Sequence, residues 1–152
     1  MSKTYSIVVK TTPEAAYAYV ADVLSHPEWS PDDMTVTAEQ PGPVRVGSTF
    51  KASGKLLGKQ NPSTVEVTAM QPASLFAFKA TDGNSVVQHE FEFRPGEGGT
   101  RIDRRVTFLK TPAAFSILFP LFHPFVIGPG NMKTLSLLKD RLEANAPPTT
   151  HS

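Results

Sequence analysis

Cysteine is absent from this sequence, and tryptophan occurs only once. The lack of cysteine excludes disulfide bonds, zinc sites built from thiolates, and a cysteine nucleophile. It also fits a protein of a reducing compartment. The first residues lack the charged and then apolar organisation of a signal peptide, so we expect a cytoplasmic location.

An excess of charge of either sign is also missing. The chain has 15 Lys and Arg against 14 Asp and Glu, a formal net charge of +1. With this balance the chain has no excess of positive charge to bind the phosphates of nucleic acid, so we expect no nucleic-acid partner. The most apolar stretch, residues 113–127, is interrupted by Pro120 and Pro124 and is too short to span a bilayer, which predicts no integral membrane segment.

Motifs of metal, nucleotide and serine-hydrolase chemistry are not found. The four histidines, His26, His89, His123 and His151, lack the spacing of metal ligands. No Gly-x-Ser-x-Gly elbow occurs, and the glycines at 96–99 belong to a hairpin turn rather than to a phosphate loop. We therefore expect no metal and no cofactor.

What the sequence does contain is enough apolar material for one core. Its 152 residues suit a single domain, which we place at 1–146, with 147–152 as a disordered tail. Phenylalanine is abundant, with 10 residues, and can either fill a core or line a cavity.

Period-two alternation and turn signals predict a sheet of about seven strands. The predicted strands are 3–11, 34–39, 47–55, 62–70, 74–80, 85–94 and 100–110, joined mostly by short turns that favour an antiparallel meander. Between the first two strands, Thr12 is a natural N-cap and Pro13 suits the first helical position. Ala16, Tyr17, Val20 and Leu24 recur at helical spacing, which predicts that they share an inward face.

The last strand pair has the clearest alternation. One predicted face carries Val87, His89, Phe91 and Phe93 on one strand and Ile102, Arg104, Val106 and Phe108 on the next. After it, residues 130–145 are amphipathic, with Met132, Leu135, Leu138 and Leu142 on one side, and predict a long C-terminal helix.

The order of strand, short helices, antiparallel strands and long helix resembles the START-like, or birch-pollen-allergen-like, superfamily, also called SRPBCC. Within it the chain looks most like the polyketide cyclase/dehydrase branch. The residues that carry the resemblance are Thr12–Val20 after the opening strand, Asp22, the Pro-Glu-Trp-Ser-Pro at 27–31, the Val-Gly-Ser-Thr-Phe at 46–50, and the Gly-Gly-Thr-Arg at 98–101. The resemblance implies an α+β helix-grip fold, in which a curved antiparallel sheet wraps a long C-terminal helix and leaves a mostly apolar cavity.

His89 and Arg104 are the candidate catalytic residues. The alternation places both on the otherwise apolar face, where an ionised guanidinium is costly unless it is paired or solvated. A ligand head or water can solve that problem, with Arg104 holding a carboxylate or polarising a carbonyl and His89 acting as acid or base. In the alternative interpretation, Arg104 pairs with a carboxylate near the sheet end and His89 bonds to a backbone group.

The candidate ligand-binding residues are apolar or aromatic residues on the expected inner surfaces. They are Tyr5, Trp29, Phe50, Phe78, Phe91, Phe93, Val106, Phe108, Phe119, Met132 and Leu135. For Tyr5 the alternative is ring packing alone, and for Trp29 it is a staple between the helical region and the sheet. The segment 113–127 can be a lid, a homodimer surface, a membrane-touching edge or ordinary core.

These features support two main functional hypotheses. The first is a binding module for a small hydrophobic or amphipathic ligand, such as a lipid, a polyketide or a related metabolite. The second is an enzyme of the polyketide cyclase/dehydratase kind that acts on a ligand in the same cavity. A protein-interaction domain that uses 113–127 is a third, weaker alternative.

Overall fold

A computed structural model describes residues 2–30, 33–56, 59–83, 85–112 and 128–145. The helices are α1 (Pro13–Ala21), the 3-10 helix η1 (Val23–Trp29) and α3 (Gly128–Asn145). The strands are β1 (Ser2–Val9), β2 (Thr35–Ala38), β3 (Thr49–Leu56), β4 (Lys59–Gln71), β5 (Leu75–Thr81), β6 (Val86–Gly96) and β7 (Gly99–Lys110).

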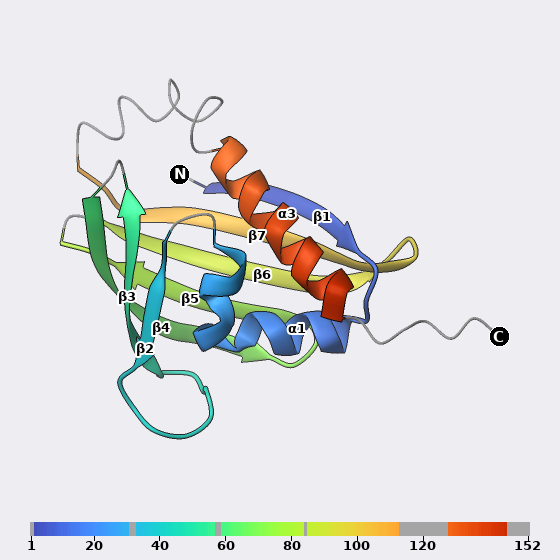
Figure 1. Ribbon diagram of the computed structural model, residues 1–152, viewed down its shortest axis with the longest axis horizontal. Coiled ribbons are helices and arrows are strands. Elements are labelled where there is room, and N and C mark those ends of the chain that lie inside the picture. Colours follow the sequence, from blue (N-terminus) through green and yellow to red (C-terminus); the bar gives the residue numbers. More distant parts are fainter. Residues whose placement is uncertain (1, 31–32, 57–58, 84, 113–127, 146–152) are drawn as a thin grey trace.

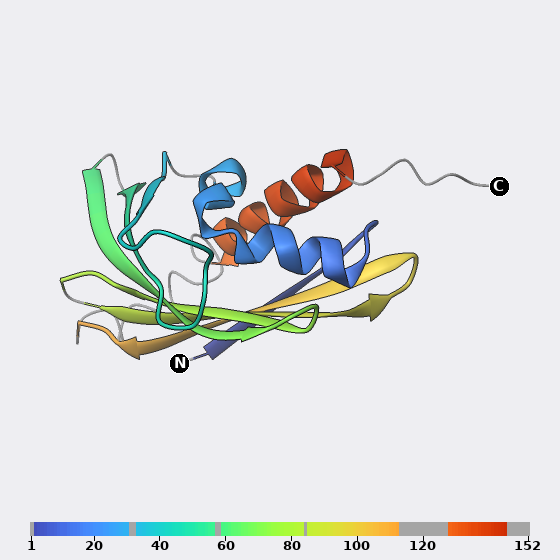
Figure 2. The ribbon, with the colours of Figure 1, turned by 90° about the horizontal axis from the view of Figure 1, so that it is seen from below.

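The strands form one seven-stranded antiparallel sheet in the order β1-β7-β6-β5-β4-β3-β2. The first strand therefore lies beside the last one, and the strands between them follow as a meander. The helices all lie on one face of the curved sheet, with α3 crossing it diagonally (Figures 1 and 2). This is the predicted α+β helix-grip fold.

The β6–β7 hairpin brings onto one face the side chains that the alternation placed together. His89 lies opposite Val106, Phe91 opposite Arg104, and Phe93 opposite Ile102. Directly opposite residues of an antiparallel pair share a face. We call this face, on which α3 also packs, the concave face.

The first helix begins as the sequence predicts, but its inward face is shorter. The Thr12 side chain accepts a hydrogen bond from the Ala15 backbone N–H at 3.1 Å, which caps the helix. Tyr17 and Val20 are buried, whereas Leu24 is 53% exposed. The inward prediction for Leu24 is wrong because α1 ends at Ala21, and the 3-10 turn that follows has a different period.

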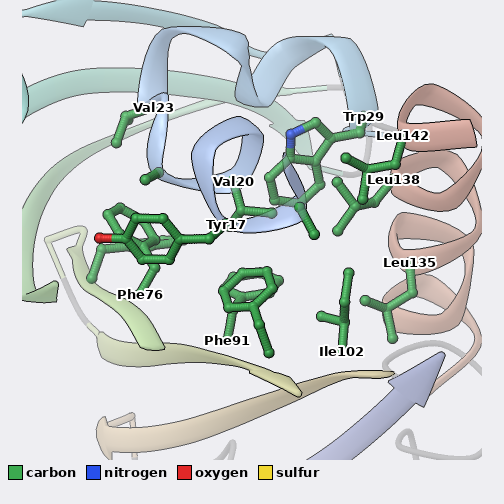
Figure 3. Close-up of a cluster of buried hydrophobic side chains, with 14 of the residues drawn as sticks. Tyr17, Val20, Val23, Trp29, Phe76, Phe91, Ile102, Leu135, Leu138 and Leu142 are labelled. Atoms are coloured by element: carbon green, nitrogen blue, oxygen red, sulfur yellow. The ribbon is translucent and has the colours of Figure 1, made fainter. Parts of the chain in front are cut away.

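The C-terminal helix is held on the concave face and along the edge of β1. Leu135, Leu138 and Leu142 are each at most 4% exposed and belong to the buried hydrophobic core between the helices and the sheet. Lys139 Nζ donates to the Val8 carbonyl at 3.3 Å, and Glu143 accepts from the Lys10 backbone N–H at 2.9 Å. Figure 3 shows these leucines facing Ile102, Phe91 and Trp29, so side chains fill the space under this part of α3.

The opposite face of the sheet is polar. Asp103 accepts hydrogen bonds from Ser6, Arg94 and Arg101, and these bonds tie β1, β6 and β7 together. They lower the pKa of Asp103 to about 2, despite the opposing effect of burial. Because neighbouring residues of a strand point to opposite faces, Asp103 points away from the face that carries Arg104.

Candidate functional site

Arg104 is a buried cation in the middle of the concave face. Its side chain comes from β7, between Tyr5 of β1 and Phe91 of β6, and the residue is only 9% exposed. The guanidinium carbon lies 5.4 Å from the centroid of the Phe91 ring, a cation–π contact. The Nε and Nη1 atoms have no hydrogen-bond partner in the described part of the chain. Burial lowers the pKa of Arg104 to about 10, so the group stays protonated at neutral pH.

His89 is the direct neighbour of this cation. Arg104 Nη2 lies 3.3 Å from His89 Nδ1. Arginine can only donate, so Nδ1 is the acceptor and the imidazole proton lies on Nε2. Burial first, and then the nearby positive charge of Arg104, hold the pKa of His89 well below its usual range. His89 is thus neutral and presents an N–H rather than a free lone pair.

The sequence analysis placed these two residues on one face of the sheet, and in the structure their side chains are in contact there. Their catalytic role stays a prediction. The alternative in which Arg104 pairs with a carboxylate is not seen in the described residues, since the polar contact of its guanidinium is with His89. The backbone bond expected for His89 in that alternative is replaced by the contact with Arg104.

Aromatic rings surround this polar pair. Phe78 stacks on His89, with 4.7 Å between ring centroids and 16° between ring planes, and on Phe91 at 6.3 Å. Trp29 contacts Phe91 edge-on at 5.8 Å, which fastens η1 to the sheet as the staple interpretation predicted. The result is an apolar surface with one charge.

His26 is a member of this cluster that the sequence reasoning considered only as a metal ligand. It is 4% exposed, lies 4.8 Å from the Trp29 ring and 5.5 Å from the Phe78 ring, and bonds through Nε2 to the Val20 carbonyl at 2.7 Å. Burial lowers its pKa to about 4, and the Arg104 charge acts in the same direction. The sequence around His26, which precedes Pro27, does not indicate that this side chain is buried. Its burial depends on how η1 packs on the sheet.

Two more buried donors lack partners in the described residues. They are the Trp29 indole Nε1 and the Tyr17 hydroxyl. Tyr17 packs its ring edge-on against Phe93 at 5.8 Å. Figure 3 shows its hydroxyl pointing away from the Trp29 side of the cluster, so these two donors do not converge.

Burial decreases along the concave face in one direction. Ile102 and Phe93, which pair under α3, are 0% and 4% exposed. Further along the same hairpin, His89, Val87 and Phe108 are only partly buried. The described elements therefore close the concave face at the end near α3 and leave it more open at the start of β6.

A cleft of about 220 Å³ lies toward the far edge of the sheet. Its walls include Ala52 and Gly54 of β3, which pair with Ser63 and Asn61 of β4, and Met34. Ala52 follows the buried Phe50 at period two, so the cleft continues the concave face.

The other predicted ligand-binding residues lie as follows. Phe50, Phe78, Phe91, Phe93, Val106, Trp29 and Leu135 are buried, Tyr5 and Phe108 are partly buried, and Met132 is 40% exposed. Phe119 and the segment 113–127 lie outside the described residues. Leu135 belongs to the filled core rather than to the more open part of the concave face.

The described residues contain no group of His, Cys, Asp or Glu side chains that could hold a metal ion. Among the helices in the same part of the chain, none combines the length and the apolar character that crossing a bilayer requires.

Comparisons with known proteins agree with this architecture. A family model described as polyketide cyclase / dehydrase and lipid transport matches residues 2–143. No curated protein sequence matches the chain.

Solved structures are similar in fold at low identity. An aromatase/cyclase, Zhui of Streptomyces sp. R1128, is 13% identical, with 100% of this chain and 99% of that one covered and a TM-score of 0.77. TTHA0849 of Thermus thermophilus is 15% identical, with 97% and 100% covered and a TM-score of 0.78. StfQ, a di-domain aromatase/cyclase of the steffimycin biosynthetic pathway, is 18% identical, with 94% of this chain and 50% of that one covered and a TM-score of 0.75. At these identities the likeness is one of fold.

Proposed function

The chain belongs to the polyketide cyclase/dehydrase and lipid transport family, and from this premise we propose that it binds a small hydrophobic or amphipathic molecule on the concave face of its sheet. The polar end of the guest lies at Arg104 and His89. Its apolar body lies over the partly buried stretch of the hairpin that includes Val87 and Phe108.

The observation that carries this proposal is the state of Arg104. This residue is 9% exposed, and His89 provides an acceptor for Nη2 alone, so Nε and Nη1 are buried without an acceptor in the described residues. An unsatisfied buried donor costs about 1–3 kcal/mol, and more when it is charged. A guest that supplies a hydrogen-bond acceptor removes that cost, and this gain contributes favourably to the free energy of binding.

The surroundings of Arg104 favour an amphipathic guest. Its neighbours Phe78 and Phe91 present aromatic surface, and His89 adds an N–H donor. A mostly apolar wall with few convergent polar groups is the composition of small-molecule sites.

A neutral fluorescent probe, N-phenyl-1-naphthylamine, tests the binding function. We expect saturable fluorescence enhancement with the wild-type protein. Val87→Trp places an indole in the partly buried stretch of the concave face and should weaken binding at least ten-fold. Glu92→Trp, an exposed position on the same strand but on the opposite face, is the matched control and should bind as the wild type does.

Equal binding by both tryptophan variants would place the guest elsewhere on the molecule. Native mass spectrometry of the purified protein adds an independent readout, because a retained small molecule would appear as a discrete mass increment that Val87→Trp reduces.

Cyclase or dehydratase activity is the second candidate function. The structural likeness to aromatase/cyclases favours it, as does the 3.3 Å contact of Arg104 with His89, because each side chain keeps further N–H groups outside that contact. Aldol closure needs a base for the α-proton and donors for the carbonyl oxygen as it gains charge. Arg104 and the His89 Nε2–H suit the second task. His89 serves as the base only after Nδ1 is released from Arg104.

Turnover of an aromatic polyketide mimic separates the two candidates. If both His89→Ala and Arg104→Ala leave turnover of an identified substrate unchanged, the catalytic assignment is wrong. If no turnover accompanies tight binding, the protein is a binding module.

A further inference from the structure

Building on the proposed binding function, we propose that the guest is an acid: an apolar body with a single carboxylate that pairs with Arg104. The inference rests on charge balance within the concave face. It narrows the class of guest from amphipathic molecules in general to monoanionic ones.

The protein does not supply the counter-charge itself in the described residues. Asp103, next in sequence to Arg104, points to the opposite face and is engaged by Ser6, Arg94 and Arg101. Glu90 lies opposite Arg105 on that same outer face, with 3.8 Å between the charged atoms.

The concave positions of the four strands nearest Arg104 carry no carboxylate. Besides Arg104 itself, these positions are Lys3, Tyr5, Ile7, Val9, Phe76, Phe78, Ala80, Val87, His89, Phe91, Phe93, Pro95, Thr100, Ile102, Val106 and Phe108. The residues that α3 presents to the core, Leu135, Leu138 and Leu142, are apolar too.

The titratable neighbours of Arg104 are neutral at physiological pH. Burial and the guanidinium keep the pKa values of His26 and His89 low, so both imidazoles are uncharged. Burial raises the pKa of Tyr5, so its phenol keeps its proton. Lys3, the other cation at a concave position of these four strands, is exposed on the edge strand β1. Within the described residues, the buried part of the site therefore carries a formal charge of one, borne by Arg104.

A carboxylate matches this site in charge and in the arrangement of hydrogen-bond donors. Nη2 bonds to His89 through one hydrogen, which leaves its second hydrogen to form a fork with the N–H of Nε or of Nη1. Such forks accept the two oxygens of a carboxylate in parallel. A neutral carbonyl or hydroxyl supplies acceptors but leaves the buried charge uncompensated, and a phosphate dianion overcompensates it.

Two pairs of probes that differ only in charge test the inference on the wild-type protein. They are decanoate with decanamide, and 2-naphthoate with 2-naphthamide, measured at pH 7.5 by calorimetry. We expect the acid of at least one pair to bind about ten-fold or more tightly than its amide, as charge-assisted hydrogen bonds are stronger than neutral ones. Equal affinities within both pairs would overturn the acid proposal and leave the binding function standing. No binding by any of the four, together with failure of the neutral fluorescent probe, would overturn both.

Substitution of Arg104 tests whether this residue is responsible for the preference for the acid over the amide. Arg104→Met keeps a long side chain without charge, and should bind acid and amide with affinities that differ less than two-fold. Arg105→Gln removes the same charge from the outer face of the same strand and should keep the full preference. Retention of the preference in Arg104→Met, or its loss in Arg105→Gln, would contradict pairing at Arg104.

Thermal stability separates this role from a structural one. If Arg104 awaits an external anion, Arg104→Met should melt at or above the wild-type temperature in the absence of guest, since an uncompensated charge has been removed. Saturating acid should then raise the melting temperature of the wild type and leave that of Arg104→Met unchanged. A large drop on substitution, with the acid shift retained, would assign Arg104 to the scaffold.

Discussion

His26 should make the protein progressively less stable as the pH falls from 6.5 to 4. The imidazole is 4% exposed, donates from Nε2 to the Val20 carbonyl, and is enclosed by the rings of Trp29 and Phe78. Its pKa is about 4 in the folded protein, against the ordinary value of 6.5. Between pH 6.5 and pH 4 the His26 imidazole is protonated in the unfolded chain but neutral in the folded protein, so acidification favours unfolding.

The size of the effect follows from the two pKa values. The folded pKa of about 4 lies about 2.5 below the ordinary value of 6.5, and a pKa difference of one corresponds to about 1.4 kcal/mol. The full loss of stability below pH 4 is therefore about 3.5 kcal/mol. About 2 kcal/mol of this is already lost at pH 5. For a chain of this size that corresponds to a fall in Tm of roughly 4–8 °C. His89, with its pKa also lowered, adds to the loss in the same direction.

Urea unfolding at pH 7.5, 6.5, 5.5 and 5.0, with and without His26→Gln, measures the effect. Glutamine retains a donor for the Val20 carbonyl but does not titrate, so the free energy of unfolding of the variant should depend less on pH by about 2 kcal/mol between pH 7.5 and 5. Far-UV circular dichroism is the suitable probe, because the His26 ring lies 4.8 Å from Trp29 and its protonation would alter the fluorescence itself.

The same pH dependence in both proteins would refute the reasoning. Titration of Asp103 does not affect the comparison of the wild type with His26→Gln between pH 7.5 and 5, because its pKa is lowered from the ordinary value of 3.8 to about 2. The stability that Asp103 contributes is present above pH 3.8 and is lost only as the pH falls from there toward 2.

Three further substitutions, one of them with a matched control, probe the scaffold. Gly99→Ala should lower the free energy of unfolding by on the order of 3 kcal/mol or more, because the new Cβ would lie 2.0 Å from the Val9 carbonyl oxygen; Gly83→Ala, with open space around it, should be nearly neutral in the same urea titration. Thr12→Ala should cost about 1 kcal/mol by removal of the cap of α1, and an unchanged unfolding midpoint would show that the cap contributes nothing. Phe91→Ala, at a fully buried position, should cost about 3–5 kcal/mol, and a loss below 1 kcal/mol would mean that the core closes around the gap.

The sheet could be predicted closely because its strands follow local rules. Alternation in the last two strands predicted which side chains share a face, and the observed pairing of His89 with Val106 and of Phe91 with Arg104 has that face. The predicted helix at 130–145 is found at Gly128–Asn145. Turns and period-two patterns are encoded within a few residues, so one sequence is enough to detect them.

Features that depend on tertiary packing were harder to predict. The helical spacing continued to Leu24, but the change to a 3-10 turn after Ala21 directs that side chain to solvent. The burial of His26 and the contact of Arg104 with His89 both require segments far apart in the chain to meet. Alternation showed that Arg104 faces the core, and it could not show whether a carboxylate would meet it there.

The pairing of β1 with β7 joins the first strand of the chain to the last one. Ser2 pairs with Thr107, and α3 bonds to the backbone at Val8 and Lys10. A chain emerging from the ribosome at roughly 5–20 residues per second must therefore keep its first strand waiting for several seconds until its neighbour is made. During that interval the concave side of β1 lacks its neighbours from β7 and α3, so we expect this strand to stay unpaired until synthesis of the chain is nearly complete.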